Sequence, residues 1–169
     1  MKTSPFFTAL GLFPFQTLAQ SPSPVQRKDS VTVSAGIPKE QLALEDQLNE
    51  IVAKGNQELR SGDAANAVKR YESALDLVHN QPLLAERKNY VLEKLANGYV
   101  QANRAKDAIP IYGQLVVERK RDCESQSAAV SNCADAQYEL GMAKIHAGDF
   151  QGALDSLREA KGNYVKAEN

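Results

Sequence analysis

The stretch GNQELRSGDAANAVKRYESA, residues 55–74, carries the strongest fold signal in the chain because its spacing returns twice. It recurs as ANGYVQANRAKDAIPIYGQL over residues 96–115 and as GMAKIHAGDFQGALDSLREA over residues 141–160. The turn residues of the three units are Gly62, Asn103 and Gly148, which lie 41 and 45 residues apart. Periods of this length are typical of repeats that form helical hairpins.

Each repeated residue type has a physical role in such a hairpin. Glycine or asparagine at a turn position favours the left-handed conformation that ends a helix. Asp63 and Asp149 follow directly, where a carboxylate caps the first amides of the next helix. Small residues on the two helices allow close approach, and a bulky residue fills the space beside them; the small residues are Gly55, Ala96, Gly141, Ala67, Ala108 and Ala153, and the bulky ones Tyr71, Tyr112 and Leu157. The spacing therefore indicates packing rather than catalysis.

The pattern predicts three antiparallel helix pairs. The expected helices cover residues 39–61 and 64–79, then 82–102 and 105–121, then 133–147 and 150–166. Pro110 falls inside one of them and removes a backbone hydrogen bond, so we expect a kink near residues 106–110.

The template resembles the tetratricopeptide repeat (TPR), whose consensus has small, Gly-Asp, Ala, aromatic and Ala residues at these intervals. The periods and Pro110 are similar to the longer repeats of the kinesin light chain type. The resemblance covers residues 47–165, although Ile51, Leu92 and Gln137 replace the consensus tryptophan. It implies an all-α fold, a right-handed α-solenoid of about three antiparallel helix pairs, over residues 39–169.

The N-terminus is predicted to be a signal peptide over residues 1–19. Lys2 precedes an apolar run from Phe6 to Phe15, and small residues follow at Thr17 and Ala19. The run is shorter than the roughly 20 residues that cross a bilayer, so we expect cleavage near Ala19 and an extracellular, secreted protein rather than a membrane anchor. Residues 20–38, rich in serine and proline, predict a disordered leader.

Cys123 and Cys133 flank the longest polar connection, residues 122–132. In a secreted protein two cysteines more often pair than stay free, so we expect a disulfide that pins this connection. Free thiols are the alternative that the residues leave open. A redox motif is disfavoured because the spacing is not Cys-x-x-Cys.

Composition and motifs disfavour several classes of function. The 20 basic and 21 acidic residues nearly cancel, which argues against a general nucleic-acid binder. Two histidines and two cysteines leave too few ligands for most zinc sites. A Gly-x-Ser-x-Gly elbow, a phosphate-binding loop and a His-Glu-x-x-His pair are all missing from the sequence. We therefore expect a protein that is not an enzyme and has no cofactor or metal.

The TPR resemblance implies that the first helix of each pair lines a concave groove for an extended or helical peptide. The groove positions are Asn49, Val52, Asn56 and Leu59; Tyr90, Glu93, Asn97 and Val100; and Asp135, Tyr138, Met142 and Ile145. The four aliphatic residues among them equally suit packing between repeats. The ligand-binding candidates are Asn49, Asn56, Tyr90, Glu93, Asn97, Asp135, Tyr138 and Met142.

One known ligand class is disfavoured residue by residue. Chaperone-binding members of the family hold a C-terminal carboxylate with two lysines, two asparagines and an arginine, and only Asn56 matches here. Val52, Lys94, Asp135 and Glu139 occupy the other positions, and the two acids would repel a carboxylate.

Two functional hypotheses remain. The first is a secreted, effector-like module that binds a protein or peptide in the groove. The alternative is a self-associating structural protein, a homo-oligomer formed through an uncapped last helix that exposes Phe150, Leu154, Leu157 and Tyr164 in part.

Overall fold

The computed structural model describes residues 38–125 and 130–167, with side chains for residues 38–121 and 131–167. The predicted signal peptide and all but the last residue of the predicted leader lie outside the described residues, so both stay predictions. The described helices belong to one unit within Gly36–Asn169.

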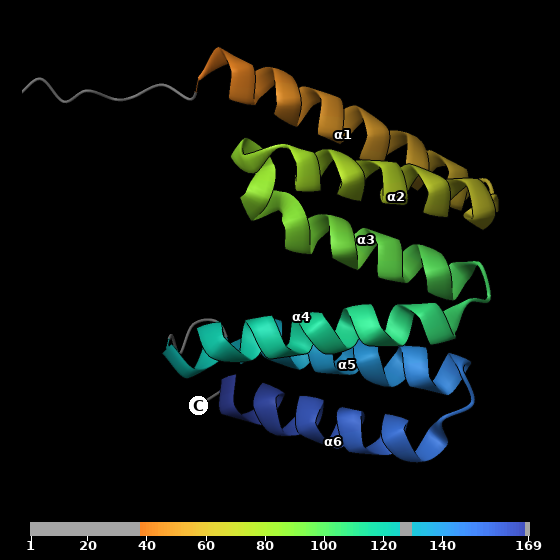
Figure 1. Cartoon of the computed structure of the whole chain (residues 1–169). Helices are drawn as coiled ribbons and strands as arrows, with labels where there is room; N and C mark the ends of the chain where they lie inside the picture. Colours follow the sequence, from red (N-terminus) through yellow and green to blue (C-terminus); the bar gives the residue numbers. More distant parts are fainter. Residues whose placement is uncertain (1–37, 126–129, 168–169) are drawn as a thin grey trace, which may run out of the picture. The chain divides into compact units, whose positions relative to one another are not determined.

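Helices make up all the regular structure of the described residues. They are α1 (Lys39–Arg60), α2 (Ala64–Asn80), the 3₁₀ helix η1 (Pro82–Arg87), α3 (Lys88–Gln101), α4 (Ala105–Ser125), α5 (Val130–His146) and α6 (Phe150–Ala167). Successive helices run antiparallel, and each packs chiefly against the next along the chain (Figure 1). The prediction of three helix pairs is confirmed, with two differences. Residues 82–87 form a 3₁₀ turn ahead of α3, and α4 and α5 extend into the predicted polar connection, over residues 122–125 and 130–132. None of the described helices has the length and apolar composition that a bilayer crossing requires.

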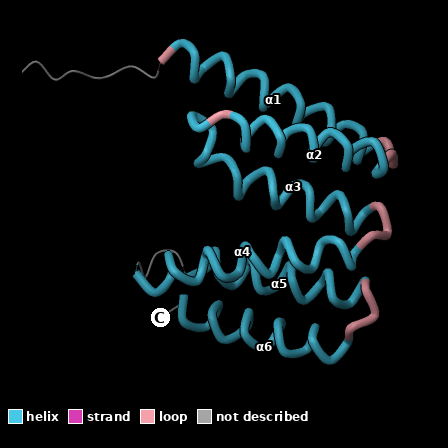
Figure 2. Tube along the Cα trace, viewed as in Figure 1, coloured by secondary structure: helices cyan, strands magenta, loops and turns pink. Residues whose placement is uncertain are grey.

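The turns that end α1, α3 and α5 have the predicted left-handed backbone. Gly62, Asn103 and Gly148 have φ angles of 85°, 58° and 83°. At the first turn the Gly62 amide donates to the Leu59 carbonyl at 3.0 Å, and the Asp63 amide donates to the Glu58 carbonyl at 2.8 Å. The other two turns repeat this pattern, which satisfies carbonyls that a helix end leaves open. Figure 2 shows these turns as loops along one edge of the helix stack.

The second helix of each pair starts at a polar residue. Asp63 Oδ1 accepts from the Asn66 amide at 3.2 Å, and Asp149 Oδ1 accepts from the Gly152 amide at 2.9 Å. These two caps confirm the predicted role of the aspartates. In the middle unit Arg104 takes the position instead, and its guanidinium lies 4.5 Å from the centre of the Tyr99 ring.

Glycines allow close contacts between neighbouring helices. A Cβ added to Gly55 of α1 would lie 2.7 Å from Cε1 of Tyr71, and one added to Gly98 of α3 would lie 3.1 Å from Cδ2 of the same ring. Tyr71 of α2 is fully buried between them. The third pair repeats the first of these contacts, because a Cβ added to Gly141 of α5 would lie 2.8 Å from Cδ2 of Leu157 on α6. The template predicted Gly55 and Gly141 as packing residues, but Gly98 was missed.

The third helix pair has a different core from the first two. Large apolar side chains fill the core of the first two pairs, among them Leu48, Leu84 and Leu115. The buried apolar side chains of α5 and α6 are mainly alanines, namely Ala134, Ala136, Ala143, Ala153 and Ala160, of which Ala143 packs into the core of the second pair. Side-chain hydrogen bonds also join α5 to α6: Gln137 donates to Glu159, and Lys144 donates to the Ser156 hydroxyl at 3.0 Å.

Pro110 lies inside α4, which continues without a break from Ala105 to Ser125. Pro110 and Lys106 are both exposed, so solvent can reach the Lys106 carbonyl that loses its helical donor. The helix therefore tolerates the proline, and the expected kink at residues 106–110 stays a prediction.

Candidate binding groove

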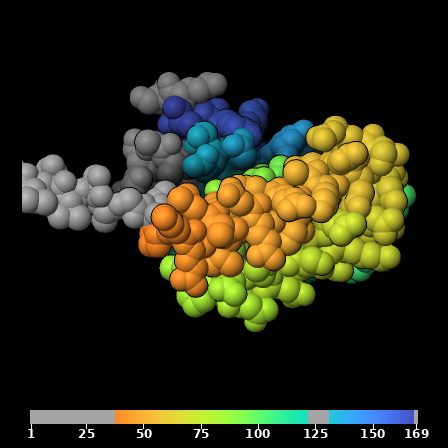
Figure 3. Space-filling view, turned by 90° about the horizontal axis from the view of Figure 1, so that it is seen from above, coloured from red at the N-terminus to blue at the C-terminus, as the bar shows by residue number. Residues whose placement is uncertain are grey.

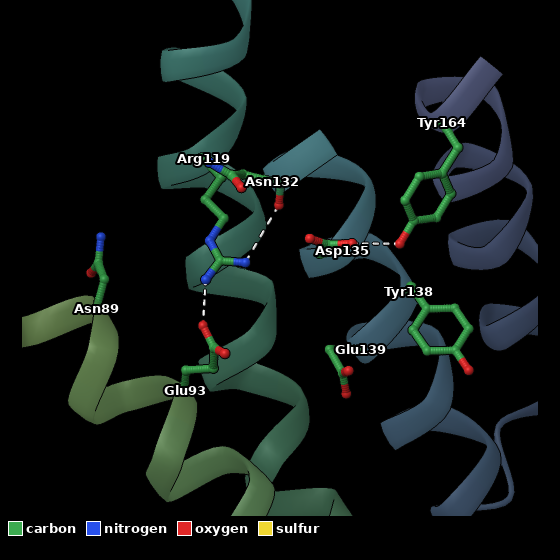
Figure 4. Close-up of a pocket in the computed structure, with 8 residues that line it drawn as sticks. All are labelled: Asn89, Glu93, Arg119, Asn132, Asp135, Tyr138, Glu139 and Tyr164. Atoms are coloured by element: carbon green, nitrogen blue, oxygen red, sulfur yellow. Dashed lines mark hydrogen bonds and ion pairs between the residues drawn. The ribbon is translucent and has the colours of Figure 1, made fainter. Parts of the chain in front are cut away.

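Three neighbouring hollows lie along the face formed by α3 and α5. The largest, about 700 Å³, is lined by Asn89, Glu93, Arg119, Asn132, Asp135, Tyr138, Glu139 and Tyr164 (Figure 4). Two smaller hollows of about 240 and 160 Å³ continue it. Glu139 lines all three, Glu93 and Tyr138 each line two, and Asn97 joins the two smaller ones. We call this continuous surface the α3–α5 groove.

The structure brings six of the eight predicted ligand-binding residues to the groove. They are Asn56, Glu93, Asn97, Asp135, Tyr138 and Met142. Asn49 and Tyr90 line none of the three hollows, and their role in ligand binding stays a prediction. The Asn49 amide oxygen accepts from Arg87 at 3.3 Å, while Arg87 and Lys94 lie 5.2 and 5.4 Å from the Tyr90 ring centre. Both residues therefore belong to a polar surface group beside the groove, and Lys94 of this group also lines the smallest hollow.

Asn56 and Asn97 occupy equivalent positions but differ in environment. The Asn56 amide oxygen accepts a hydrogen bond from the buried Tyr71 hydroxyl at 2.9 Å. Asn97 is exposed, and its side chain makes no hydrogen bond within the described part of the chain. Asn56 thus supports the core, whereas both the donor and the acceptor of Asn97 remain available to a ligand.

Two groove residues, Arg119 and Tyr164, were missed because the predicted groove positions all lie on the first helix of each pair. Arg119 comes from α4 and Tyr164 from α6, both second helices. Each lies sixteen residues after its turn residue, where the first unit has the buried Val78. The sequence signal that could have revealed these two residues is a charged or hydroxyl-bearing side chain at a position where the first unit has an apolar one.

Carboxylates outnumber cations around the largest hollow. Arg119 forms an ion pair with Glu93 and also donates to the Asn132 carbonyl at 3.4 Å. Tyr164 donates its hydroxyl to Asp135 at 2.6 Å, as Figure 4 shows. The two other acids thus have a partner, but Glu139 has no hydrogen bond or ion pair to any described residue.

Two pKa shifts follow from this arrangement. Burial, with repulsion from Glu93 and Asp135, raises the pKa of Glu139 above that of an ordinary carboxyl. The hydrogen bond to Asp135 raises the pKa of Tyr164 to about 12, so the hydroxyl stays a donor at neutral pH. The hollow thus holds an excess of negative charge that its own arginine does not neutralise. Within the described residues, no three histidine, cysteine, aspartate or glutamate side chains lie in positions that could hold one metal ion.

Comparison with known proteins bears on the fold. No family model matches this sequence, and no curated protein matches it either. Among solved structures, the chain is similar to the crystal structure of the TPR domain of Arabidopsis FLU, with a TM-score of 0.59. The fold is TPR-like. The likeness covers 72% of this chain and 97% of that chain at 15% identity, so it shows the fold alone and confirms the predicted all-α solenoid.

Proposed function

We propose that this TPR-like domain is a protein-binding module, not an enzyme, and that it holds a basic peptide segment in the α3–α5 groove. The observation that carries the proposal is the position of Glu139, which lines all three hollows and has no hydrogen-bond or ion-pair partner among the described residues. A lysine or arginine of the ligand would supply the missing cation and form a charge-assisted hydrogen bond. It would also relieve the repulsion that Glu139 experiences from Glu93 and Asp135.

Other side chains of the groove suit the rest of a peptide. Asn97 offers an amide that both donates and accepts, as a peptide backbone requires. The half-exposed Tyr138 ring offers a face for an apolar side chain or a cation. The hollows are three connected depressions that meet at Glu139 rather than one enclosed cavity, which suits a peptide segment that lies across them. Asp135 and Glu139 disfavour a ligand that presents its C-terminal carboxylate.

The test is selection from a displayed library of random twelve-residue peptides on the full chain. We expect enriched peptides to carry lysine or arginine, and their binding, measured by calorimetry, to weaken at least about tenfold in Glu139→Lys. Glu86→Lys is the matched control, because it makes the same charge change at an exposed glutamate outside the groove. Enrichment of acidic peptides, or equal binding by Glu139→Lys, would refute the proposal.

We further propose that the protein acts after secretion, in an effector-like role. The signal-like residues 1–19 and the cysteine pair support this. Cys133 is buried at the start of α5, next to Asn132 of the largest hollow, so a bridge to Cys123 would brace one wall of the groove. The Cys123 side chain lies outside the described ones, and the disulfide stays a prediction.

Secretion and the disulfide have separate tests. N-terminal sequencing of secreted material should begin near Gln20, and retention of Met1 would contradict cleavage. Peptide mapping without reductant should find Cys123 and Cys133 in one linked species. Free thiols on protein folded in its native compartment would exclude the bridge.

A further inference from the structure

α6 exposes a stripe of apolar side chains. Phe150 is 70% exposed, Leu154 43% and Val165 51%, and their spacing places them on one face of the helix. Leu157 lies half-buried at the edge of this stripe. Lys161 falls within it, but a lysine stem can cover apolar surface while its ammonium stays in water. We call the surface of Phe150, Leu154, Leu157 and Val165 the α6 face.

The first helix pair shows what such a face is built to contact. Leu154 and Leu157 follow the turn residue of their pair by six and nine residues. Val68 and Tyr71 of α2 follow the turn residue of the first pair by the same numbers, so they are the equivalent positions. Val68 and Tyr71 are at most 2% exposed because α3 packs over them, with Gly98 against both side chains. The structure therefore indicates that the α6 face fits another helix.

The polar surface of α1 makes it a poor candidate for that helix. Val91, Leu95 and Gly98 are the α3 residues that cover α2. Counted back from the turn residue of each helix, the equivalent residues of α1 are Glu50, Lys54 and Gln57, and all three are exposed. Glu50 and Lys54 form an ion pair at 2.7 Å. Figure 3 views the stack from the α1 end, where these residues would have to lose water if α1 of a second copy were stacked on α6.

We propose that the α6 face binds the α6 face of a second copy, so that the protein forms a closed dimer with twofold symmetry. Of the exposed large apolar side chains in the described residues, four lie on α6: Phe150, Leu154, Tyr164 and Val165. The remaining ones are scattered over other elements, so α6 itself is the best apolar counterpart that this chain offers. An antiparallel pair centred near Leu157 places Phe150 opposite Val165 of the second copy. Such a pairing uses the same patch on both chains and therefore stops at two.

The proposed dimer does not depend on a peptide ligand in the groove. A single pair of helices buries less than the roughly 1,200 Å² of a standard stable interface, so we expect association at micromolar concentrations. This expectation sets the concentration range of the test.

The test is sedimentation equilibrium of the full chain from about 1 to 200 µM. We expect a monomer–dimer equilibrium, with a dissociation constant at least about tenfold weaker in Phe150→Glu/Leu154→Glu. Val117→Glu is the control, because Val117 is 56% exposed on α4, away from the α6 face; it should dimerise like the wild type. Circular dichroism melting curves check that all three proteins fold.

Four results would overturn the dimer. They are a wild-type chain that stays monomeric over the whole range, growth beyond two copies, equal dimerisation of the α6 variant, and equal loss in Val117→Glu. A chain that stays monomeric over the whole range but binds basic peptides would refute the dimer and leave the groove proposal standing.

Discussion

Asn103 holds a backbone conformation that glycine adopts at lower cost. Its φ of 58° matches the glycines at the other two turns, and it is the sole non-glycine residue with a positive φ in the described part of the chain. We predict that Asn103→Gly raises the free energy of unfolding by roughly 0.5 to 1 kcal/mol. Gly62→Ala should lower it by about 1 to 2 kcal/mol. Urea denaturation of both variants checks these opposite signs, and a less stable Asn103→Gly protein would contradict the account.

Glu139 makes stability depend on pH. A raised pKa means that the folded state binds this proton more tightly than the unfolded state does, so the stability contribution of Glu139 falls as pH rises through the folded pKa. We predict that Glu139→Gln has a higher melting temperature than the wild type at pH 7. The difference should shrink once pH falls below the ordinary carboxyl pKa, where Glu139 is neutral in both states. Calorimetric scans between pH 3 and 8 measure it, with Glu86→Gln as the control for loss of one exposed carboxylate. A constant difference at all pH values would argue against this explanation.

The contact of α1, α2 and α3 at Tyr71 should make a glycine-to-alanine substitution in α1 destabilising, whereas the same substitution at an open position of another helix should stabilise the protein. Replacing a helical glycine by alanine normally adds up to about 1 kcal/mol of stability. At Gly55 the new Cβ would lie 2.7 Å from Tyr71, whose ring has little room to retreat because Gly98 approaches its other edge. We predict a net loss for Gly55→Ala, because overpacking costs about 1 to 3 kcal/mol.

Gly113 of α4 is the matched control for Gly55. A Cβ added there meets nothing within 4 Å, so Gly113→Ala should stabilise the protein by up to about 1 kcal/mol. Thermal or urea denaturation of the two variants provides the comparison. Stabilisation by both substitutions would mean that Tyr71 can shift, and the close contact would then have little energetic weight.

The unequal cores predict unequal local stability along the stack. Neighbouring units support each other in a repeat protein, and a unit that buries less apolar area opens at lower free energy. The buried apolar side chains of α5 and α6 are mainly alanines, whereas leucine, valine and tyrosine fill the core around Leu48 and Tyr71, so we expect less apolar area to be buried in the third pair. We therefore predict that amides of α6 exchange with solvent faster than those of α2 in a dilute solution of the full chain. Hydrogen exchange measured by mass spectrometry provides the test, and equal protection of α2 and α6 would contradict it.

The order of the six α-helices, the three left-handed turns and the pairing of Gly55 with Tyr71 followed from the sequence alone. These features depend on residues that are close along the chain or repeat at one spacing, so chemistry such as the αL preference of Asn103 is visible without coordinates. The groove was predicted only in part. Six candidates on first helices reach it, because α-helical spacing places them on one face of each helix.

The tertiary structure was needed wherever helices far apart in sequence meet. It brings Arg119 of α4 and Tyr164 of α6 beside carboxylates of α3 and α5, it engages the Asn56 amide with Tyr71, and it leaves Asn49 and Tyr90 outside. It also covers Val68 of α2 while leaving the corresponding Leu154 exposed. The physical reason is that burial and charge pairing depend on which neighbour a side chain meets in space, and the same local pattern meets different neighbours at each position in the stack.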